Sequence, residues 1–294
     1  MRYYFRTRTL VLRGTFRAAG TGNPGGLDDV PTILFQAGGE PADRDDSPRR
    51  LESVLRREGL PQKYFGILTG GVRAENICIM QYDYLTLFLD AGATQGDGGS
   101  PVPVSMVVIS REGMTDAALL EAIMTVTAAR EEALRSAGRR SGGSPLDGVI
   151  VACEGKVQHQ SAGSASEIGM RLRESVSFGV AEALARQEGR AKRDVPSFFI
   201  YSRYQGGHWV EWVPKDCPYY PCHFPGQRCD FCYCPFYPCG DEALGQWVAS
   251  ASRNGEVWNC SGCTLLHEPE IADYLIAHPE APLAELKRKK GRPR

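Results

Sequence analysis

Cysteine is nearly absent from most of this chain, and so are long apolar runs. Only two of the ten cysteines, Cys78 and Cys153, precede residue 217, which argues against the dense disulfide framework of small secreted domains. No segment approaches the roughly 18 apolar residues that a membrane helix requires. The first residues carry arginines where a signal peptide would have an apolar stretch. We therefore expect a cytoplasmic protein without a membrane segment.

An excess of charge of one sign is also missing. The formal net charge is -1, so the chain lacks the broad basic surface that attracts nucleic acid. The exception is the basic run at residues 287–294, whose Gly-Arg-Pro core is similar to segments that carry arginines into A·T-rich minor grooves. A short basic end is more often a solubilising tail, so we do not expect nucleic acid as a partner.

The other eight cysteines are clustered near the C-terminal end. The hexapeptide Cys-Pro-Tyr-Tyr-Pro-Cys at 217–222 recurs as Cys-Pro-Phe-Tyr-Pro-Cys at 234–239, and two Cys-x2-Cys pairs complete the set. In a cytoplasmic chain this clustering predicts metal ligation, and a Cys-x2-Cys turn points two sulfurs at one tetrahedral ion. Zinc is favoured over an iron–sulfur cluster, and disulfides or free thiols are the remaining reading. The predicted ligands are Cys217, Cys222, Cys229, Cys232, Cys234, Cys239, Cys260 and Cys263.

Eight thiolates would fill two closed sites of four sulfurs each, and the pairing is open. One arrangement joins the two Cys-x2-Cys pairs in one site and the two hexapeptides in the other. His223 or His267 could replace a sulfur, although histidines hydrogen-bonded beside the site are the commoner arrangement. A closed site leaves no coordination position for a substrate, so the metal would be structural. The module would then serve as a surface, for example for a protein partner.

We expect an α+β body, with a mixed sheet and packed helices, joined to this small metal-stapled module. The expected divisions are a body at 1–212, a cysteine-rich domain at 213–280 and a basic tail at 281–294. Helices are predicted at 116–136 and 167–187, with Thr115 and Ser166 as N-caps. β-branched and apolar runs predict strands at 9–15, 31–36, 64–69, 77–81, 84–89, 104–110 and 148–153.

Residues that could carry chemistry follow the strands of the body. The glycine-rich loop at 20–26 could bring backbone amides close to a ligand, although a hairpin turn is the simpler reading. Carboxylates at strand ends, such as Asp147, could form a general base or acid. Cys153 and His159 could form a nucleophile and its base, but a lone cysteine ending an apolar strand is usually a small buried residue.

Several short stretches of the chain occur together in one known family. In the body they are Phe16-Arg17-Ala18, Gly25-Gly26, Tyr-Phe-Gly-Ile-Leu-Thr at 64–69, Ala91-Gly92, Thr-Asp-Ala-Ala-Leu at 115–119, Asp147, and Ala162-Gly163 with Glu167 and Gly169. In the module they are both hexapeptides and Asp-Phe-Cys-Tyr-Cys at 230–234. Over nearly its whole length, the chain resembles an adenosylcobinamide amidohydrolase of the archaeal type fused to a cysteine-rich small domain.

The resemblance implies hydrolysis of the amide that joins an aminopropanol arm to the corrinoid ring. Adenosylcobinamide or a related corrinoid would be the substrate, and adenosylcobyric acid would be released for coenzyme B12 synthesis. Amide hydrolysis needs an activated water and donors for the oxyanion. We assign the base to Asp147, Asp29 or Glu167. The substrate-binding candidates are Arg17, Gly25, Gly26, Thr69, Gly92 and Gly163, with the oxyanion donors expected around Gly25 and Gly26.

The chain departs from the family pattern at 100–105, 128–130 and 144–146. Two other functions therefore stay open. A non-catalytic corrinoid-binding protein would bind cobinamide and release no aminopropanol. An interaction protein that uses its zinc module and basic tail to recruit DNA or another protein would show salt-sensitive DNA binding.

Overall fold

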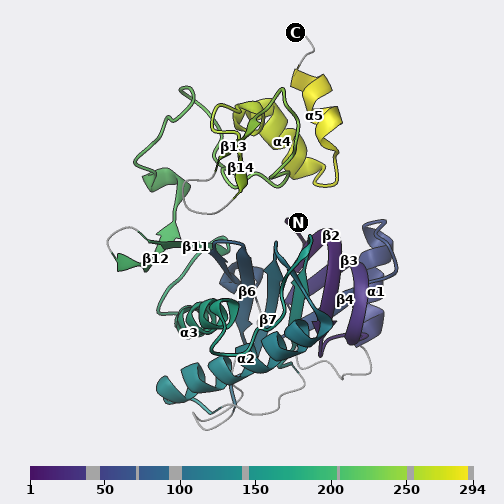
Figure 1. The fold of residues 1–294 in the computed structure, drawn as a ribbon, viewed down its shortest axis with the longest axis vertical. Coiled ribbons are helices and arrows are strands. Elements are labelled where there is room, and N and C mark those ends of the chain that lie inside the picture. Colours follow the sequence, from purple (N-terminus) through teal and green to yellow (C-terminus); the bar gives the residue numbers. More distant parts are fainter. Residues whose placement is uncertain are drawn as a thin grey trace. The chain divides into compact units, whose positions relative to one another are not determined.

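The computed structural model describes residues 1–37, 47–70, 73–92, 101–140, 146–203, 206–249 and 255–290. The chain divides into two compact units, Tyr3–Trp212 and Val213–Arg294 (Figure 1). The first unit, here called the body, contains the large sheet. The second, called the module, contains the eight clustered cysteines.

The body is built on one mixed sheet. Its strand order is β12-β11-β5-β6-β7-β9-β2-β3-β4, with β1 paired to β2, and β8 and β10 form a separate parallel pair. The strands are β1 (Arg2–Arg6), β2 (Thr9–Gly20), β3 (Gly26–Ala37), β4 (Phe65–Thr69), β5 (Cys78–Tyr82), β6 (Leu85–Ala91), β7 (Val104–Ser110), β8 (Gly113–Met114), β9 (Val149–Cys153), β10 (Val157–His159), β11 (Ser197–Ser202) and β12 (His208–Trp212). The helices are α1 (Ser47–Arg57), α2 (Asp116–Ser136) and α3 (Glu167–Gln187).

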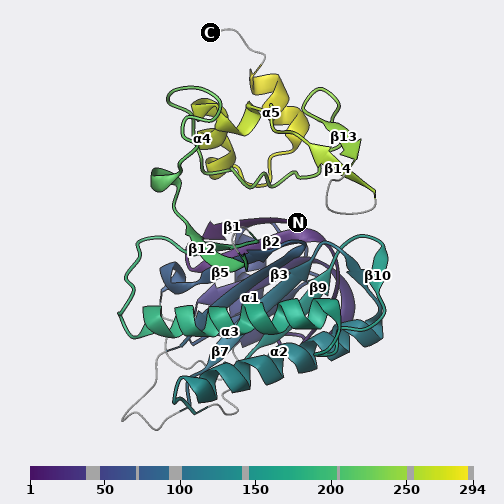
Figure 2. The same cartoon turned by 60° about the vertical axis from the view of Figure 1, so that its left-hand side comes forward.

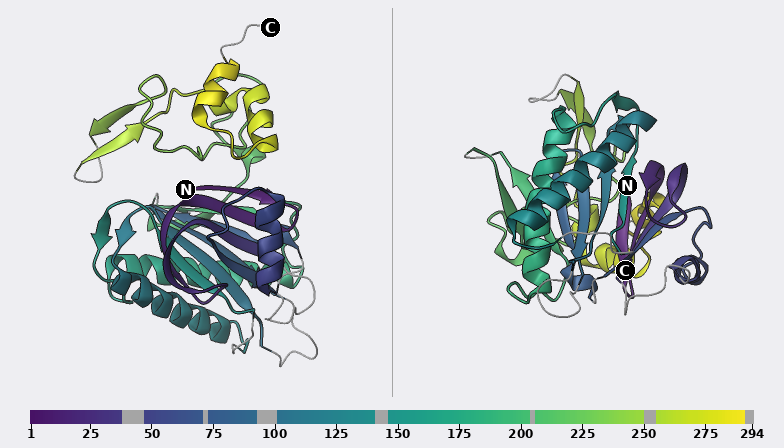
Figure 3. Two further views of the ribbon diagram at one scale, coloured as in Figure 1. Left: turned by 90° about the vertical axis from the view of Figure 1, so that its right-hand side faces the viewer. Right: turned by 90° about the horizontal axis from the view of Figure 1, so that it is seen from below.

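The long β2–β3 hairpin bends the sheet around an apolar core. Its register shifts by one residue between Arg13 and Phe16, and a bulge of this kind increases the local twist. The tip then reaches β4, where Asn23 and Gly66 exchange two backbone hydrogen bonds of 2.7 Å. Figure 3 shows these purple strands curving around their neighbours. The enclosed core includes Phe16 and Phe88, both almost fully buried.

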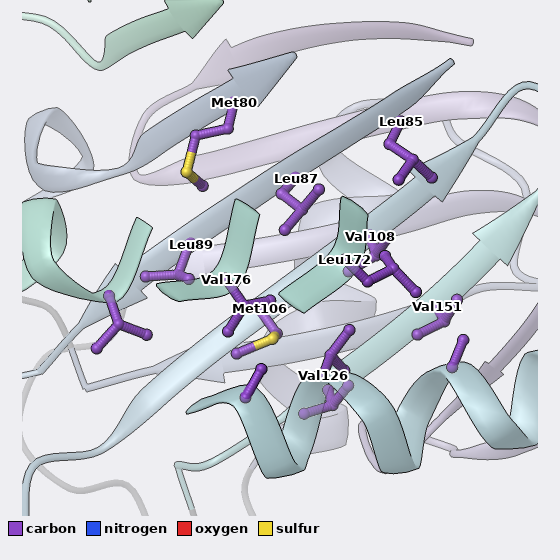
Figure 4. Packing of buried hydrophobic residues seen from close by; sticks show 14 of the residues in the cluster. Met80, Leu85, Leu87, Leu89, Met106, Val108, Val126, Val151, Leu172 and Val176 are labelled. Atoms are coloured by element: carbon purple, nitrogen blue, oxygen red, sulfur yellow. The ribbon is translucent and has the colours of Figure 1, made fainter. Parts of the chain in front are cut away.

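Helices cover the opposite face of the sheet. The side chains of β6, β7 and β9 are all buried, as expected for strands covered on both faces. Helices α2 and α3 lie side by side on one face (Figure 2). Met106, Val126 and Leu172 meet between sheet and helices (Figure 4). Helix α1 packs Leu51 and Leu55 over β3 and β4.

The two predicted helices are confirmed. Helix α2 begins at Asp116 because the Thr115 hydroxyl accepts the N–H of Ala118, and α3 begins after Ser166 in the same way. All seven predicted strands are present as well, and the α+β class with a mixed sheet is confirmed. Strand β1, helix α1 and the β11–β12 hairpin were not predicted. The predicted strand at 9–15 ends too early and the one at 31–36 begins too late, because β2 runs to Gly20 and β3 begins at Gly26.

The module has little regular structure. It contains the hairpin β13 (Gln246–Ala249) and β14 (Glu256–Asn259), and the helices α4 (Pro269–Ala277) and α5 (Leu283–Lys290). Its apolar cluster includes Leu265, Ile271 and Leu286. The structure therefore differs from the expected tail at 281–294: residues 283–290 form a helix, and Leu286 is fully buried in the module. Residues 291–294 lie outside the described part of the chain.

Candidate functional site

An open pocket of about 700 Å³ lies in the body where β2, β9 and α2 meet. The register brings these elements together, because Arg17 of β2 pairs with Cys153 of β9 on one side and with Asp29 of β3 on the other. The pocket volume lies in the range of small-molecule sites. The lining residues are Thr15, Arg17, Asp29, Gly113, Met114, Thr115, Asp116, Ala117, Cys153, Glu154, Gly155 and Val157.

The charged centre of this pocket is a guanidinium between two carboxylates. Arg17 donates from Nε to Asp116 Oδ1 at 2.8 Å and from Nη2 to Oδ2 at 2.7 Å. Its Nη1 lies 3.7 Å from Asp29 Oδ2. The hydrogen bond from Arg17 lowers the pKa of Asp116, and the bond to Asp116 raises the pKa of Arg17. Both oxygens of Asp116 are thus engaged, whereas 76% of the Asp29 side chain is exposed to the pocket and solvent.

The N-terminus of α2 contributes backbone donors to the same pocket. The first amides of a helix have no intrahelical acceptor, and the helix dipole makes this end positive. The Thr115 hydroxyl accepts the N–H of Ala118, and Asp116 and Ala117, the first two residues of α2, line the pocket. Asp116 was not among the predicted site residues, although it is part of the Thr-Asp-Ala-Ala-Leu motif at 115–119.

Cys153 is buried, and its surroundings disfavour a nucleophile. Burial raises the pKa of the Cys153 thiol, which keeps the weakly nucleophilic protonated form. Met114 N–H points at Cys153 Sγ at 3.2 Å. His159 lies with Glu112, its Nε2 being 2.9 Å from Glu112 Oε2. The structure therefore agrees with the simpler interpretation of Cys153 as a small buried residue, and His159 pairs with a carboxylate instead.

Asp147 lies at the other end of β9. Its Oδ1 accepts the N–H of Val104 at 2.8 Å. The buried Arg130 donates to the carbonyl oxygen of the same Val104 at 3.2 Å. Asp147 thus ties the start of β7 to the residue segment before β9, and Arg130 ties it to α2. Arg130 lies in segment 128–130, which departs from the family sequence pattern. In this chain, that segment therefore has a structural role.

The predicted glycines also gather at this second end of the sheet. Gly25 and Gly26 close the β2–β3 hairpin with positive φ angles of 78° and 99°, which supports the simpler reading of the loop. Thr69 ends β4, and the next residue, Gly70, lies so close to Gly92 that a Cβ on Gly92 would come within 2.7 Å of the Gly70 Cα. The predicted site residues are thus divided between two ends of the sheet.

Glu167 and Gly163 lie near the start of α3. Glu167 is 70% exposed and forms an ion pair with Arg171 at 2.6 Å. Glu121 of α2 accepts hydrogen bonds from Ser161, Ala162 and Gly163. These bonds, led by that from the Ser161 hydroxyl, lower the pKa of Glu121. Glu121 therefore anchors the loop that precedes α3.

In the module, the thiols of Cys232 and Cys234 have raised pKa values, and each is influenced by a different set of sulfurs. Burial raises the pKa of Cys232, and the neighbouring sulfurs of Cys229, Cys222 and Cys217 raise it further. Burial likewise raises the pKa of Cys234 to about 11, and the sulfurs of Cys260, Cys263 and Cys239 raise it further. In each case, the sulfurs that act on the thiol come from one hexapeptide and one Cys-x2-Cys pair. We refer to Cys217, Cys222, Cys229 and Cys232 as the first sulfur group, and to Cys234, Cys239, Cys260 and Cys263 as the second.

Two histidines lie beside the first sulfur group. The rings of His223 and His267 are 4.5 Å apart, and His267 Nδ1 lies 2.7 Å from the Arg228 carbonyl oxygen. Burial lowers the pKa of His223, and His267 lowers it further. His267 thus forms the hydrogen bond expected of a histidine beside a site.

Among the described residues, a preformed metal-binding cluster and a membrane-spanning helix are both absent. Within residues 1–290, apart from the gaps given above, no three His, Cys, Asp or Glu side chains are arranged closely enough to hold an ion. In the same residues, no helix has the length and apolar character needed to cross a membrane.

Comparisons with known proteins match both units. A family model described as adenosylcobinamide amidohydrolase covers residues 3–192, and one described as cysteine-rich small domain covers residues 208–290. An adenosylcobinamide amidohydrolase of Methanosarcina mazei is 28% identical over 199 residues, which is 63% of this chain and 98% of that protein.

Two further relatives match over shorter stretches of this chain. The uncharacterized protein MJ0836 of Methanocaldococcus jannaschii is 45% identical over 62 residues, 21% of this chain and 51% of that protein. A probable cobalt-factor III C(17)-methyltransferase of Methanothermobacter thermautotrophicus is 50% identical over 54 residues, 18% of this chain and 14% of that protein. Among solved structures, the PH0078 protein of Pyrococcus horikoshii aligns over 70% of this chain and 76% of that chain at 9% identity, with a TM-score of 0.31.

Proposed function

The chain belongs to the adenosylcobinamide amidohydrolase family, and from this premise we propose that the pocket at Arg17 is its active site. As a member, it is an amidohydrolase that cleaves the aminopropanol amide of adenosylcobinamide in corrinoid salvage. The observation that carries this function is the family match, which spans residues 3–192 and so includes the whole lining of the pocket. The substrate is adenosylcobinamide or a related corrinoid.

The pocket supplies the groups that amide hydrolysis requires. We assign the general base to Asp29, because Asp116 is engaged by Arg17 through both oxygens while Asp29 meets Arg17 through one. Asp29 takes a proton from water as the water oxygen bonds to the amide carbon. The carbon–nitrogen bond then breaks, and the proton passes to the nitrogen of the departing aminopropanol.

The negative charge that develops on the amide oxygen needs preorganised donors. We assign these donors to the amides of Asp116 and Ala117, at the positive end of α2, and to the Arg17 guanidinium, because all three residues line the pocket. They support an oxyanion site here better than the hairpin turn at Gly25 and Gly26. Losing one such donor typically lowers the rate by about 10²–10³.

Paired variants on β3 test the assignment. Asp29→Asn should lower turnover of adenosylcobinamide to adenosylcobyric acid by about 10²–10⁴, because general-base catalysis contributes that much. Asp28→Asn is the matched control, since neighbouring residues on a strand face opposite sides and Asp28 bonds Lys63 outside the pocket. The product is measured by mass spectrometry.

Three outcomes would overturn parts of this proposal. Normal turnover in a folded Asp29→Asn variant, with a steep loss in Asp147→Asn or Glu167→Gln, would move the base to that residue. Tight cobinamide binding without product in the unmodified protein would favour a corrinoid-binding protein. Absence of both binding and product would favour an interaction protein.

For the module, we propose structural zinc. Eight thiols in two groups of four match the donor type and number of two closed tetrathiolate sites. An ion there would stabilise the fold of a unit that has a small apolar cluster. The stretch of 54 residues that is 50% identical to part of a probable cobalt-factor III C(17)-methyltransferase supports a role of this chain in corrinoid metabolism, with another protein of the pathway as a partner.

The lysines of the basic C-terminal helix α5 make contacts within the module and are therefore poorly placed to bind nucleic acid. Lys287 bonds Asp241, Lys289 lies 3.7 Å from the ring centre of Tyr274, and Lys290 bonds Thr264. These ammonium groups are engaged within the module, which supports the expectation that nucleic acid is not a partner. A cytoplasmic location remains part of the proposal.

A further inference from the structure

The module positions its sulfurs in a way that the repeat in the sequence does not reveal. Each hexapeptide begins with the same turn, in which the N–H of the fourth residue bonds the carbonyl of the first: Tyr220 to Cys217 at 3.2 Å, and Tyr237 to Cys234 at 3.1 Å. Each Cys-x2-Cys pair has a corresponding turn, from Cys232 to Cys229 and from Cys263 to Cys260. The module thus contains two copies of each kind of turn.

Gln227 joins one hexapeptide to the nearer Cys-x2-Cys pair. Its Nε2 donates to Cys222 Sγ at 3.1 Å and lies 3.5 Å from Cys229 Sγ. Its Oε1 accepts the backbone N–H groups of His223 and Phe224. Only 5% of Gln227 is exposed, so this amide is a fixed part of the interior. The two sulfurs that it contacts therefore belong to one group.

The second group lies against the apolar cluster of the module. Cys234 and Cys263 pack against the cluster that contains Leu265 and Leu266. One cysteine of the second hexapeptide and one of the second Cys-x2-Cys pair thus lie against the same apolar cluster.

We propose that the module binds two metal ions at separate sites, one formed by Cys217, Cys222, Cys229 and Cys232 and the other by Cys234, Cys239, Cys260 and Cys263. This inference rests on the proposal of structural zinc and adds the ligand pairing. Gln227 is a positioning residue of the first site, because N–H donors to ligating sulfurs fix their orientation.

Two double variants of the full-length protein separate this pairing from its rival. Cys222→Ser/Cys229→Ser removes ligands from one proposed site, so the zinc content should fall from two ions per chain to one. Cys222→Ser/Cys239→Ser damages both proposed sites, so both ions should be lost. If the hexapeptides formed one site and the Cys-x2-Cys pairs the other, the two results would be exchanged. Zinc is counted by mass spectrometry of the intact protein and by elemental analysis, with Cys78→Ala as the control that keeps both ions.

Alkylation of thiols provides a second readout on protein that stays folded. In Cys222→Ser, iodoacetamide should modify Cys217, Cys229 and Cys232, while the four cysteines of the second site stay protected. Modification of Cys234 and Cys239 in that variant would overturn the pairing. No bound zinc in the unmodified protein, with all eight thiols alkylated, would overturn the zinc proposal itself. If the purified protein contained two iron–sulfur clusters and showed the same protection pattern, the pairing would stand and the zinc proposal would be overturned.

The proposed role of Gln227 is tested by Gln227→Glu. A carboxylate cannot donate to sulfur, and its charge lies beside thiolates. Zinc affinity should fall about 10–100-fold at the first site alone, as measured by competition with a chromophoric chelator. Equal weakening of both sites, or no weakening, would overturn that role.

Discussion

At the scale of single residues, the Arg17–Asp116 pair joins two strictly local motifs. The residues are 99 positions apart, so neither motif alone indicates the other as its partner. Sequence analysis could find Arg17 because it lies in a recognisable stretch. It could not find the pocket, because the pocket depends on the register of β2 against β3 and β9. For the same reason, the sulfur grouping could not be predicted, since every pairing of turns was compatible with the spacing.

Asp147 provides a residue-scale prediction that separates structure from catalysis. Asp147→Ala should lower the free energy of unfolding by about 1–3 kcal/mol, because the partly buried N–H of Val104 loses an acceptor. Asp147→Asn should cost less, since the amide oxygen can still accept. Urea denaturation of the two variants measures the difference. Equal destabilisation would show that the charge itself is needed at this position.

At the scale of elements, local signals determined what could be predicted. The bounds of α2 and α3 follow from cap residues and from glycines just beyond the helices, all within a few positions of the helix ends. Helix α1 was missed because its eleven residues are rich in charge and present only Leu51, Val54 and Leu55 as buried apolar side chains. Hairpin β11–β12 was missed although burial alternates along most of both strands, and it joins the sheet through β5, which lies far away in sequence.

The β2–β3 hairpin gives the prediction at this scale. A Cβ on Gly22 would come within 2.3 Å of the Gly66 carbonyl oxygen, so Gly22→Ala should push the tip away from β4. We expect a loss of about 1–3 kcal/mol in the free energy of unfolding. Gly163→Ala is the control, because the nearest atom to its Cβ would be 3.8 Å away. Similar loss in both variants would contradict the close approach as the cause.

At the scale of the whole molecule, the two units depend on different forces. The body has an apolar core on both sides of its sheet. The module has a much smaller cluster, and units of this size usually need metal or disulfide crosslinks. The family activity belongs to the body, because the matching family model covers residues 3–192. The body and the module can therefore lose structure separately.

Limited proteolysis of the intact protein tests this separation. After metal removal with a chelator, protease should cut within residues 213–290 while a body fragment ending near residue 212 persists. The same digestion after zinc is restored is the control. A module that resists protease equally well without metal would show that its apolar cluster is sufficient for folding.

The contiguity of the two sulfur groups has a consequence during synthesis of the chain. All four ligands of the first site precede all four of the second along the sequence. Chains emerge from the ribosome N-terminal end first, and units fold as they emerge. The first site can therefore capture its ion once Cys232 has left the exit tunnel, before the β13–β14 hairpin has emerged and folded. The direction of translation thus makes the first site bind its ion before the second. This order reduces the chance that an ion binds an incorrect combination of the eight thiols.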